Sequence, residues 1–124
     1  MSLKNQNLNT NLHFMNLQDD PFNSIACGQK SVELRLYDDK RKKILVGDNI
    51  EFTKASDDTQ KILCKVVDLK VFQNFQQLFC SVSPKLCGYQ DDKSPLECAK
   101  DMSKYYTIDE QLDKGAVAIF IKKI

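Results

Sequence analysis

The stretch GQKSVELRLY, residues 28–37, is the most informative segment of this chain. Apolar residues alternate with polar ones along it: Val32, Leu34 and Leu36 are apolar, and Ser31, Glu33 and Arg35 are polar. Because successive side chains of a strand point to opposite faces, this alternation predicts a strand over residues 31–37. The apolar residues then face the core, and the polar residues share the opposite face.

A short helix is predicted immediately before this strand. Asp20 suits the N-cap and Pro21 the first helical position, as is typical of helix starts. Phe22, Ile25 and Ala26 then lie on one face, and Gly28 is suited to end the helix in a left-handed conformation.

Further strands are predicted downstream at residues 44–46, 50–53 and 61–72. Turn signals separate them at Gly47-Asp48 and at residues 56–58. The basic run Lys40–Lys43, which Asp38 and Asp39 precede, is predicted to be a solvated loop.

The C-terminal half alternates helical and irregular segments before a last strand. Helices are predicted at residues 74–80, from Ser94 to about residue 105, and from Thr107, which has Glu110 at capping-box spacing. Residues 115–121 are apolar at nearly every position, which favours a central strand covered on both faces. The predicted class is α+β with a largely antiparallel, curved sheet or small β-barrel, because repeated βαβ units are absent.

Length and composition indicate one folded domain. The 124 residues suffice for a single core, and the polar lead-in 1–11, which has no secretory pattern, is expected to be partly mobile before a domain at 12–124. No apolar run approaches the roughly 18–20 residues that a membrane helix needs, so no membrane association is expected. The five cysteines lack Cys-x-x-Cys spacing and His13 is the one histidine, so we expect no metal, no cofactor and a reducing, cytoplasmic setting.

The side chains best suited to catalysis or ligand binding cluster in the same segment, residues 28–37. No glycine-rich phosphate loop occurs, and a Ser-His-Asp site would require His13 next to the polar lead-in. Lys30, Ser31, Glu33 and Arg35 instead bring an ammonium, a hydroxyl, a carboxylate and a guanidinium together at a helix-to-strand junction.

The pattern Gly28-x-Lys30-x-x-Glu33-x-Arg35 resembles the signature of the ASCH (activating signal cointegrator homology) domains. The similarity extends over about residues 12–124, and the flanking residues resemble a small stand-alone bacterial subfamily. The flanking matches include Leu12-His13, Pro21-Phe22, Leu36-Tyr37-Asp38, Lys40-Arg41, Gly47-Asp48, Phe52, Cys87-Gly88-Tyr89 and Tyr105-Tyr106. The resemblance implies a PUA-like β-barrel with short helices packed on it and a cleft lined by the signature.

The resemblance also implies binding of RNA or of a nucleotide- or nucleoside-like ligand. Lys30 and Arg35 would donate to phosphate or base oxygens, and Glu33 would accept from an exocyclic amine. Gly28 belongs to the same expected ligand-binding set. Aromatic candidates for stacking on a base are Tyr37, Tyr89 and Tyr105 or Tyr106, and the Lys40–Lys43 run would follow a nucleic-acid backbone.

Two alternative functions remain open. Some small bacterial relatives are amidohydrolases that deacetylate acetylcytidine, and this chain resembles them at Lys30 and Arg35 but has Glu33 where they carry a Thr nucleophile. An enzyme would then need either Ser31 as the nucleophile or Glu33 to activate a water molecule. Lys30 could act as the base if burial lowers its pKa. Asp91 and Asp92 are the candidates for a second catalytic carboxylate. The other alternative is a protein-interaction module presented by residues 74–114. The ligand, the choice of RNA or DNA, and the oligomeric state are not determined by the sequence.

Overall fold

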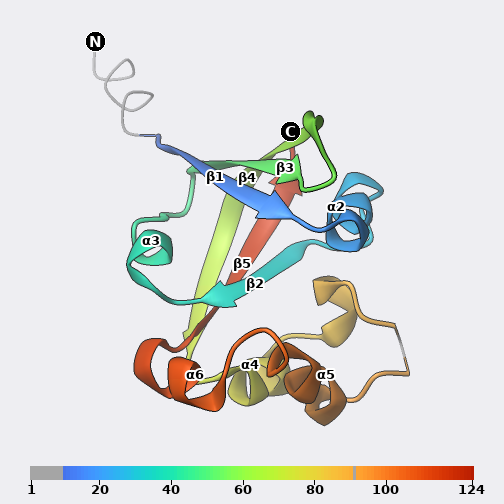
Figure 1. The fold of residues 1–124 in the computed structure, drawn as a ribbon. Coiled ribbons are helices and arrows are strands. Elements are labelled where there is room, and N and C mark those ends of the chain that lie inside the picture. The colour runs from blue at the N-terminus through green and yellow to red at the C-terminus, as the bar shows by residue number, and fades with distance from the viewer. Residues whose placement is uncertain (1–9, 91) are drawn as a thin grey trace.

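The computed structural model describes residues 10–90 and 92–124. Its elements in chain order are β1 (Leu12–Leu17), α2 (Asp19–Ala26), β2 (Val32–Leu36), α3 (Asp39–Lys42), β3 (Asn49–Lys54), β4 (Asp57–Phe72), α4 (Phe75–Ser81), the 3-10 helix η1 (Pro84–Cys87), α5 (Pro95–Met102), α6 (Ile108–Lys114) and β5 (Ala116–Lys123). Figure 1 shows α4, α5 and α6 gathered on one side of the sheet, with α2 near the end of β1.

The five strands form one curled sheet in the order β1-β3-β4-β5-β2. The β1–β3 pair is parallel, and the other pairs are antiparallel. β4 is 16 residues long and pairs first with β3 and then with β5, with a register shift between Val66 and Asp68. Such a bulge bends a strand, so the sheet curls into a half-barrel. The predicted α+β class with a curved, largely antiparallel sheet is confirmed.

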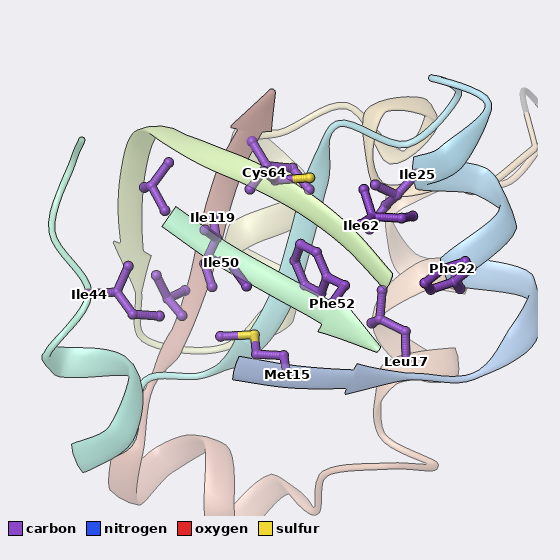
Figure 2. Packing of buried hydrophobic residues seen from close by; sticks show 13 residues of the cluster. Met15, Leu17, Phe22, Ile25, Ile44, Ile50, Phe52, Ile62, Cys64 and Ile119 are labelled. Carbon is purple, nitrogen blue, oxygen red and sulfur yellow. The ribbon is translucent and has the colours of Figure 1, made fainter. Parts of the chain in front are cut away.

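The core has two parts, one on each face of β5. The first lies inside the curled sheet and contains Met15, Phe22, Phe52 and Ile119, as Figure 2 shows. The second lies between the sheet and the helices α4 and α5, and includes Val32 and Phe75. Alternate residues of β5 enter the two parts, which explains why that strand is apolar on both faces and confirms its predicted central position.

Several local predictions are confirmed. Val32, Leu34 and Leu36 are buried in the second core cluster. Gly28 follows the C-cap of α2 with φ +86°, and both helices at residues 95–102 and 108–114 begin with the reciprocal hydrogen bonds of a capping box, at Ser94 and Thr107.

Other local predictions are wrong. β1 was not predicted, although His13, Met15 and Leu17 alternate with exposed residues. The basic run forms the short helix α3, because Asp38 caps it by accepting from the Arg41 amide. Residues 44–46 form no strand. β4 begins at Asp57, inside the turn predicted at residues 56–58, and not at residue 61. α2 begins at Asp19 with Gln18 as its N-cap, so Asp20 lies inside the first turn instead of capping it.

Most of the polar lead-in, residues 1–9, lies outside the described residues. Within the described part, no helix is long and apolar enough to cross a membrane. All five cysteines are free, with Cys64, Cys87 and Cys98 buried and Cys27 and Cys80 exposed.

Candidate functional site

A cleft of about 520 Å³ opens between β1 and β2, the two strands at opposite edges of the sheet. Its walls come from α2, the segment after η1, α5 and the loop between α5 and α6. The lining comprises Asn16, Leu17, Gln18, Asp20, Pro21, Ser24, Lys30, Glu33, Leu34, Arg35, Ala55, Cys87, Gly88, Tyr89, Asp101, Met102, Tyr105 and Tyr106. Small-molecule sites are typically concave and of roughly 300–1,000 Å³, so this cleft has the size of one.

Glu33 lies at the centre of the polar lining and is almost fully buried, with 3 % of its surface exposed. Lys30 Nζ lies 2.9 Å from its Oε1, and Arg35 Nε donates to its Oε2 at 2.6 Å. Burial by itself raises the pKa of Glu33, but the charges and hydrogen bonds of Lys30 and Arg35 outweigh it and hold the pKa below the usual 4.5. Glu33 is therefore a carboxylate at neutral pH and a weak base.

The register of β2 puts Glu33 and Arg35 on the inner face of the curled sheet. Glu33 pairs with Ile119 of β5 and Arg35 pairs with Val117. Directly paired residues of antiparallel strands project to the same face, and Val117 and Ile119 belong to the inner core cluster. The polar face of β2 is thus mostly enclosed rather than solvated.

Gly88 allows the segment after η1 to pack closely against the Lys30 side chain. Its φ of +94° suits glycine, and a Cβ at this position would lie 3.2 Å from Lys30 Cδ. The segment Cys87–Tyr89 therefore packs directly on the Lys30 side chain. Burial raises the pKa of the Cys87 thiol to about 12, so this cleft-lining cysteine stays protonated.

Three tyrosines line the cleft, and two of them are held by neighbours. Tyr106 stacks on Phe75 at 5.6 Å between ring centroids, and Tyr89 meets Phe79 edge to face at 5.7 Å. The Tyr89 hydroxyl donates to Asp101 Oδ2 at 2.8 Å. Burial raises the pKa of both phenols, with the Asp101 charge adding to the effect at Tyr89. Tyr105 is 69 % exposed and is not held in this way.

The family model for the ASCH domain matches residues 15–114, most of the chain. The chain belongs to the ASCH domain family. Among curated proteins, no sequence is similar enough to this chain to count as a match.

Several solved structures are similar to this one. The crystal structure of the hypothetical protein PH0355 has a TM-score of 0.80 and 30 % sequence identity, over 91 % of this chain and 99 % of that one. A solution structure of protein PF0455 from Pyrococcus furiosus has a TM-score of 0.69 and 23 % identity, over 91 % and 97 % of the two chains. The crystal structure of ASCH from Zymomonas mobilis has a TM-score of 0.62 and 14 % identity, over 90 % and 66 %. The last two similarities show the fold alone, and they agree with a PUA-like half-barrel.

The ASCH signature residues do not all reach the cleft. Lys30, Glu33 and Arg35 line it together, as does Tyr89. Gly28, Ser31 and Tyr37 do not line it. The backbone of Ser31 is bonded to Leu86 and Ile121, and the Tyr37 ring packs at the inner core cluster, with Lys42 Nζ 5.7 Å from its centroid.

The charged and histidine candidates lie outside the ASCH signature, and none of those that the structure describes lines the cleft. The Lys40–Lys43 run is not part of the lining, and neither is Asp92, while Asp91 lies outside the described residues. His13 Nε2 donates to the Asp48 carboxylate at Oδ2, 2.8 Å away, at the start of β1. No group of three or more potential metal ligands occurs among residues 10–90 and 92–124.

Sequence reasoning missed five polar residues of the ASCH cleft: Asn16, Gln18, Asp20, Ser24 and Asp101. Asp20 was assigned to a helix cap, and nothing marked Ser24 or Asp101. The helical period could have identified Ser24, because residues four positions apart lie on the same face of a helix and Ser24 is four residues after Asp20. Asp101 carries no local signal, because it reaches the cleft only through the packing of α5.

Proposed function

We propose that this ASCH domain binds the nucleoside unit of RNA or of a nucleotide-like small molecule in the cleft between β1 and β2. The observation that carries the proposal is the buried carboxylate of Glu33, held between Lys30 and Arg35 in a cleft that three tyrosines also line. This set combines fixed donors and an acceptor with aromatic surface, which is what recognition of an unstacked base requires.

The polar groups keep hydrogen-bonding capacity for a ligand. An ionised carboxylate has about four lone-pair sites, and an ammonium has three donors, so Glu33 and Lys30 are not used up by their ion pair. Glu33 suits an exocyclic amine of a base, and Lys30 suits a base carbonyl oxygen. Since Tyr89 and Tyr106 are already packed, their ordering costs little entropy when a ligand binds.

A second candidate function is hydrolysis of an acylated cytidine, which the family resemblance suggested. Lys30 lines the cleft, and Ser24 is its one Ser or Thr residue among those described. The low pKa of Glu33 and the location of Ser31 outside the lining weaken the two catalytic schemes based on those residues. Binding therefore ranks ahead of catalysis. The cytoplasmic location and the protein-interaction alternative stay predictions.

The test of binding is a titration with cytidine, uridine, adenosine and guanosine, followed by calorimetry and by amide chemical shifts. Tyr105→Ala should weaken the best of them about tenfold without changing the free energy of unfolding, because base stacking contributes about 1–3 kcal/mol and Tyr105 is exposed. Leu112→Ala is the matched control, since Leu112 is equally exposed on α6 and outside the cleft. No saturable binding by any nucleoside would contradict the proposal.

Turnover of acetylcytidine, followed by chromatography, tests the second candidate. Turnover that disappears in Lys30→Ala would make the protein an enzyme and would direct attention to Ser24. An unchanged substrate would retire that activity and leave the binding proposal unaffected.

A further inference from the structure

We propose that the cleft selects an unphosphorylated nucleoside over the corresponding nucleotide, and that Asp20 and Asp101 make this selection. The inference rests on the proposed function and specifies its ligand class. Two observations support it: the lining has more carboxylates than cations, and Arg35 already donates hydrogen bonds to Glu33 and Asn16.

The charged groups of the lining are more acidic than basic. Among the lining residues, Lys30 and Arg35 supply two cations, whereas Glu33, Asp20 and Asp101 supply three carboxylates. Asp101 Oδ1 also lies 3.5 Å from Nζ of Lys104, but this lysine is outside the lining and its side chain is 74 % exposed, so solvent weakens the pair. A sphere of 520 Å³ is about 10 Å across, so a ligand at its centre lies about 5 Å from the walls, which is less than the Debye length of about 8 Å at physiological ionic strength. Salt therefore screens these groups only partly from one another, and a charge on the ligand experiences all five. A phosphate enters a site whose net charge has its own sign.

Arg35 already has one edge of its guanidinium, the one formed by Nε and Nη2, bonded to protein groups. Arginine binds phosphate through two parallel N–H bonds from one edge of the guanidinium. In this cleft Nε donates to Glu33 at 2.6 Å and Nη2 donates to the backbone oxygen of Asn16 at 2.9 Å. Both nitrogens of the Nε–Nη2 edge are thereby bonded to protein groups, and a phosphate could occupy that edge only by displacing one of them; Nη1 keeps its donors.

The charge of Lys30 is also largely compensated. Its ammonium lies 2.9 Å from Glu33 Oε1, and 11 % of its side chain is exposed. Lys30 retains donors for a neutral oxygen of a base, but the carboxylate beside it offsets the attraction to a second anion.

A second hollow adjoins the cleft, and its charged residues are all acidic. This hollow shares Gln18, Asp20, Pro21, Ala55 and Tyr105 with the cleft and adds Asp19 and Ser56 but no cation. The hydroxyls of a ribose can donate to carboxylates, whereas phosphate oxygens are acceptors only when ionised. A sugar with free hydroxyls therefore suits this hollow, and a phosphorylated sugar does not.

The strongest run of positive charge lies elsewhere. Lys40, Arg41, Lys42 and Lys43 belong to α3 and its C-cap, and none of them is part of the lining. A nucleic-acid backbone that followed these residues would not be following the cleft. The site thus fits a free nucleoside better than a nucleotide within an RNA chain.

The experiment compares cytidine with cytidine 5′-monophosphate by calorimetry at about 50 mM and 200 mM salt, and repeats this with the other three pairs. The wild-type protein should bind at least one nucleoside about tenfold more tightly than its monophosphate, which is a difference of about 1.4 kcal/mol. The double variant Asp20→Asn/Asp101→Asn should reduce that ratio at least fivefold, because the isosteric amides remove the charge and still accept the Tyr89 hydrogen bond. The ratio should be larger at the lower salt concentration.

Asp113→Asn is the control, because Asp113 is an exposed carboxylate on α6 outside both hollows. A monophosphate that binds the wild-type protein as tightly as its nucleoside would overturn the inference while leaving the proposed function in place. A ratio unchanged in the double variant would overturn the assignment to Asp20 and Asp101. Absence of binding by every nucleoside and every monophosphate would overturn the proposed function and the inference with it.

Discussion

Arg35 Nη2 donates to the backbone oxygen of Asn16 at 2.9 Å, and this hydrogen bond joins β2 to β1. The two strands lie at opposite ends of the sheet order, so no ladder of backbone hydrogen bonds connects them. A side chain thus spans the opening of the half-barrel, at the place where the cleft is lined by both strands. The same guanidinium holds Glu33 through Nε. Arg35 thus contributes both to the contact between β1 and β2 and to the organisation of the site.

Arg35→Ala should destabilise the domain by about 2–4 kcal/mol, because it leaves Glu33 buried with one cationic partner instead of two. Arg35→Lys should recover only part of this loss, since an ammonium lacks the planar fork that reaches Glu33 and Asn16 together. Urea denaturation measures both. Lys61→Ala, at an exposed pair 3.8 Å from Glu51, should change the free energy of unfolding by less than about 1 kcal/mol. An effect of Arg35→Ala no larger than that of the control would show that the bridge is unimportant.

Glu33→Gln should change how stability depends on pH. The folded protein holds the pKa of Glu33 below the unfolded value near 4.5, so the charged form contributes stability above that pH. This contribution is lost as the pH falls through the folded pKa. The gap in free energy of unfolding between the wild type and Glu33→Gln should therefore be largest at neutral pH, at about 2–4 kcal/mol, and shrink below pH 4.5. Denaturant titrations from pH 7 to pH 3 measure it, and a gap independent of pH would contradict the assigned ion pairs.

Gly88→Ala and Gly28→Ala form a matched pair. Both glycines have positive φ, +94° and +86°, so each substitution should cost about 1–2 kcal/mol of stability through backbone strain. Only the Cβ at position 88 meets Lys30, at 3.2 Å, whereas the one at position 28 has nothing within 4 Å. Gly88→Ala should therefore also shift the NMR signals of the Lys30 side chain and weaken nucleoside binding. Equal effects of the two variants on binding would rule out a role for this contact.

Asp48→Asn tests the anchor at the start of β1. The buried carboxylate bonds to His13 Nε2 at 2.8 Å and accepts from the amides of Leu45 at 3.0 Å and Asn11 at 3.3 Å. Burial raises the pKa of Asp48, but these hydrogen bonds and the His13 charge outweigh it, so its pKa lies below the usual 3.8. The variant should lose about 1–3 kcal/mol of stability and speed amide exchange at Leu45. Exchange at Leu45 as slow as in the wild type would show that the side chain does not protect this loop.

Much of the local structure could be predicted because its causes lie close together in the sequence. The strand around Val32 follows from alternation, and the helix at 108–114 follows from Thr107 and Glu110, three residues apart. The failures have equally local reasons. α3 was missed because four adjacent cations dominated the interpretation, although Asp38 is a good cap. β1 was missed because this strand, which begins at Leu12, follows directly on the polar lead-in.

The sequence by itself determined the α+β class, the strand that carries Lys30, Glu33 and Arg35, and the resemblance that led to the ASCH family. Only the tertiary structure decided which other residues meet that strand. Asn16 and Asp101 lie 19 and 66 positions from Arg35, and they reach the cleft through the curl of the sheet and the packing of α5. Local patterns encode which face of an element is apolar. Long-range pairing depends on how several such faces are buried together, and no short stretch of sequence contains that information.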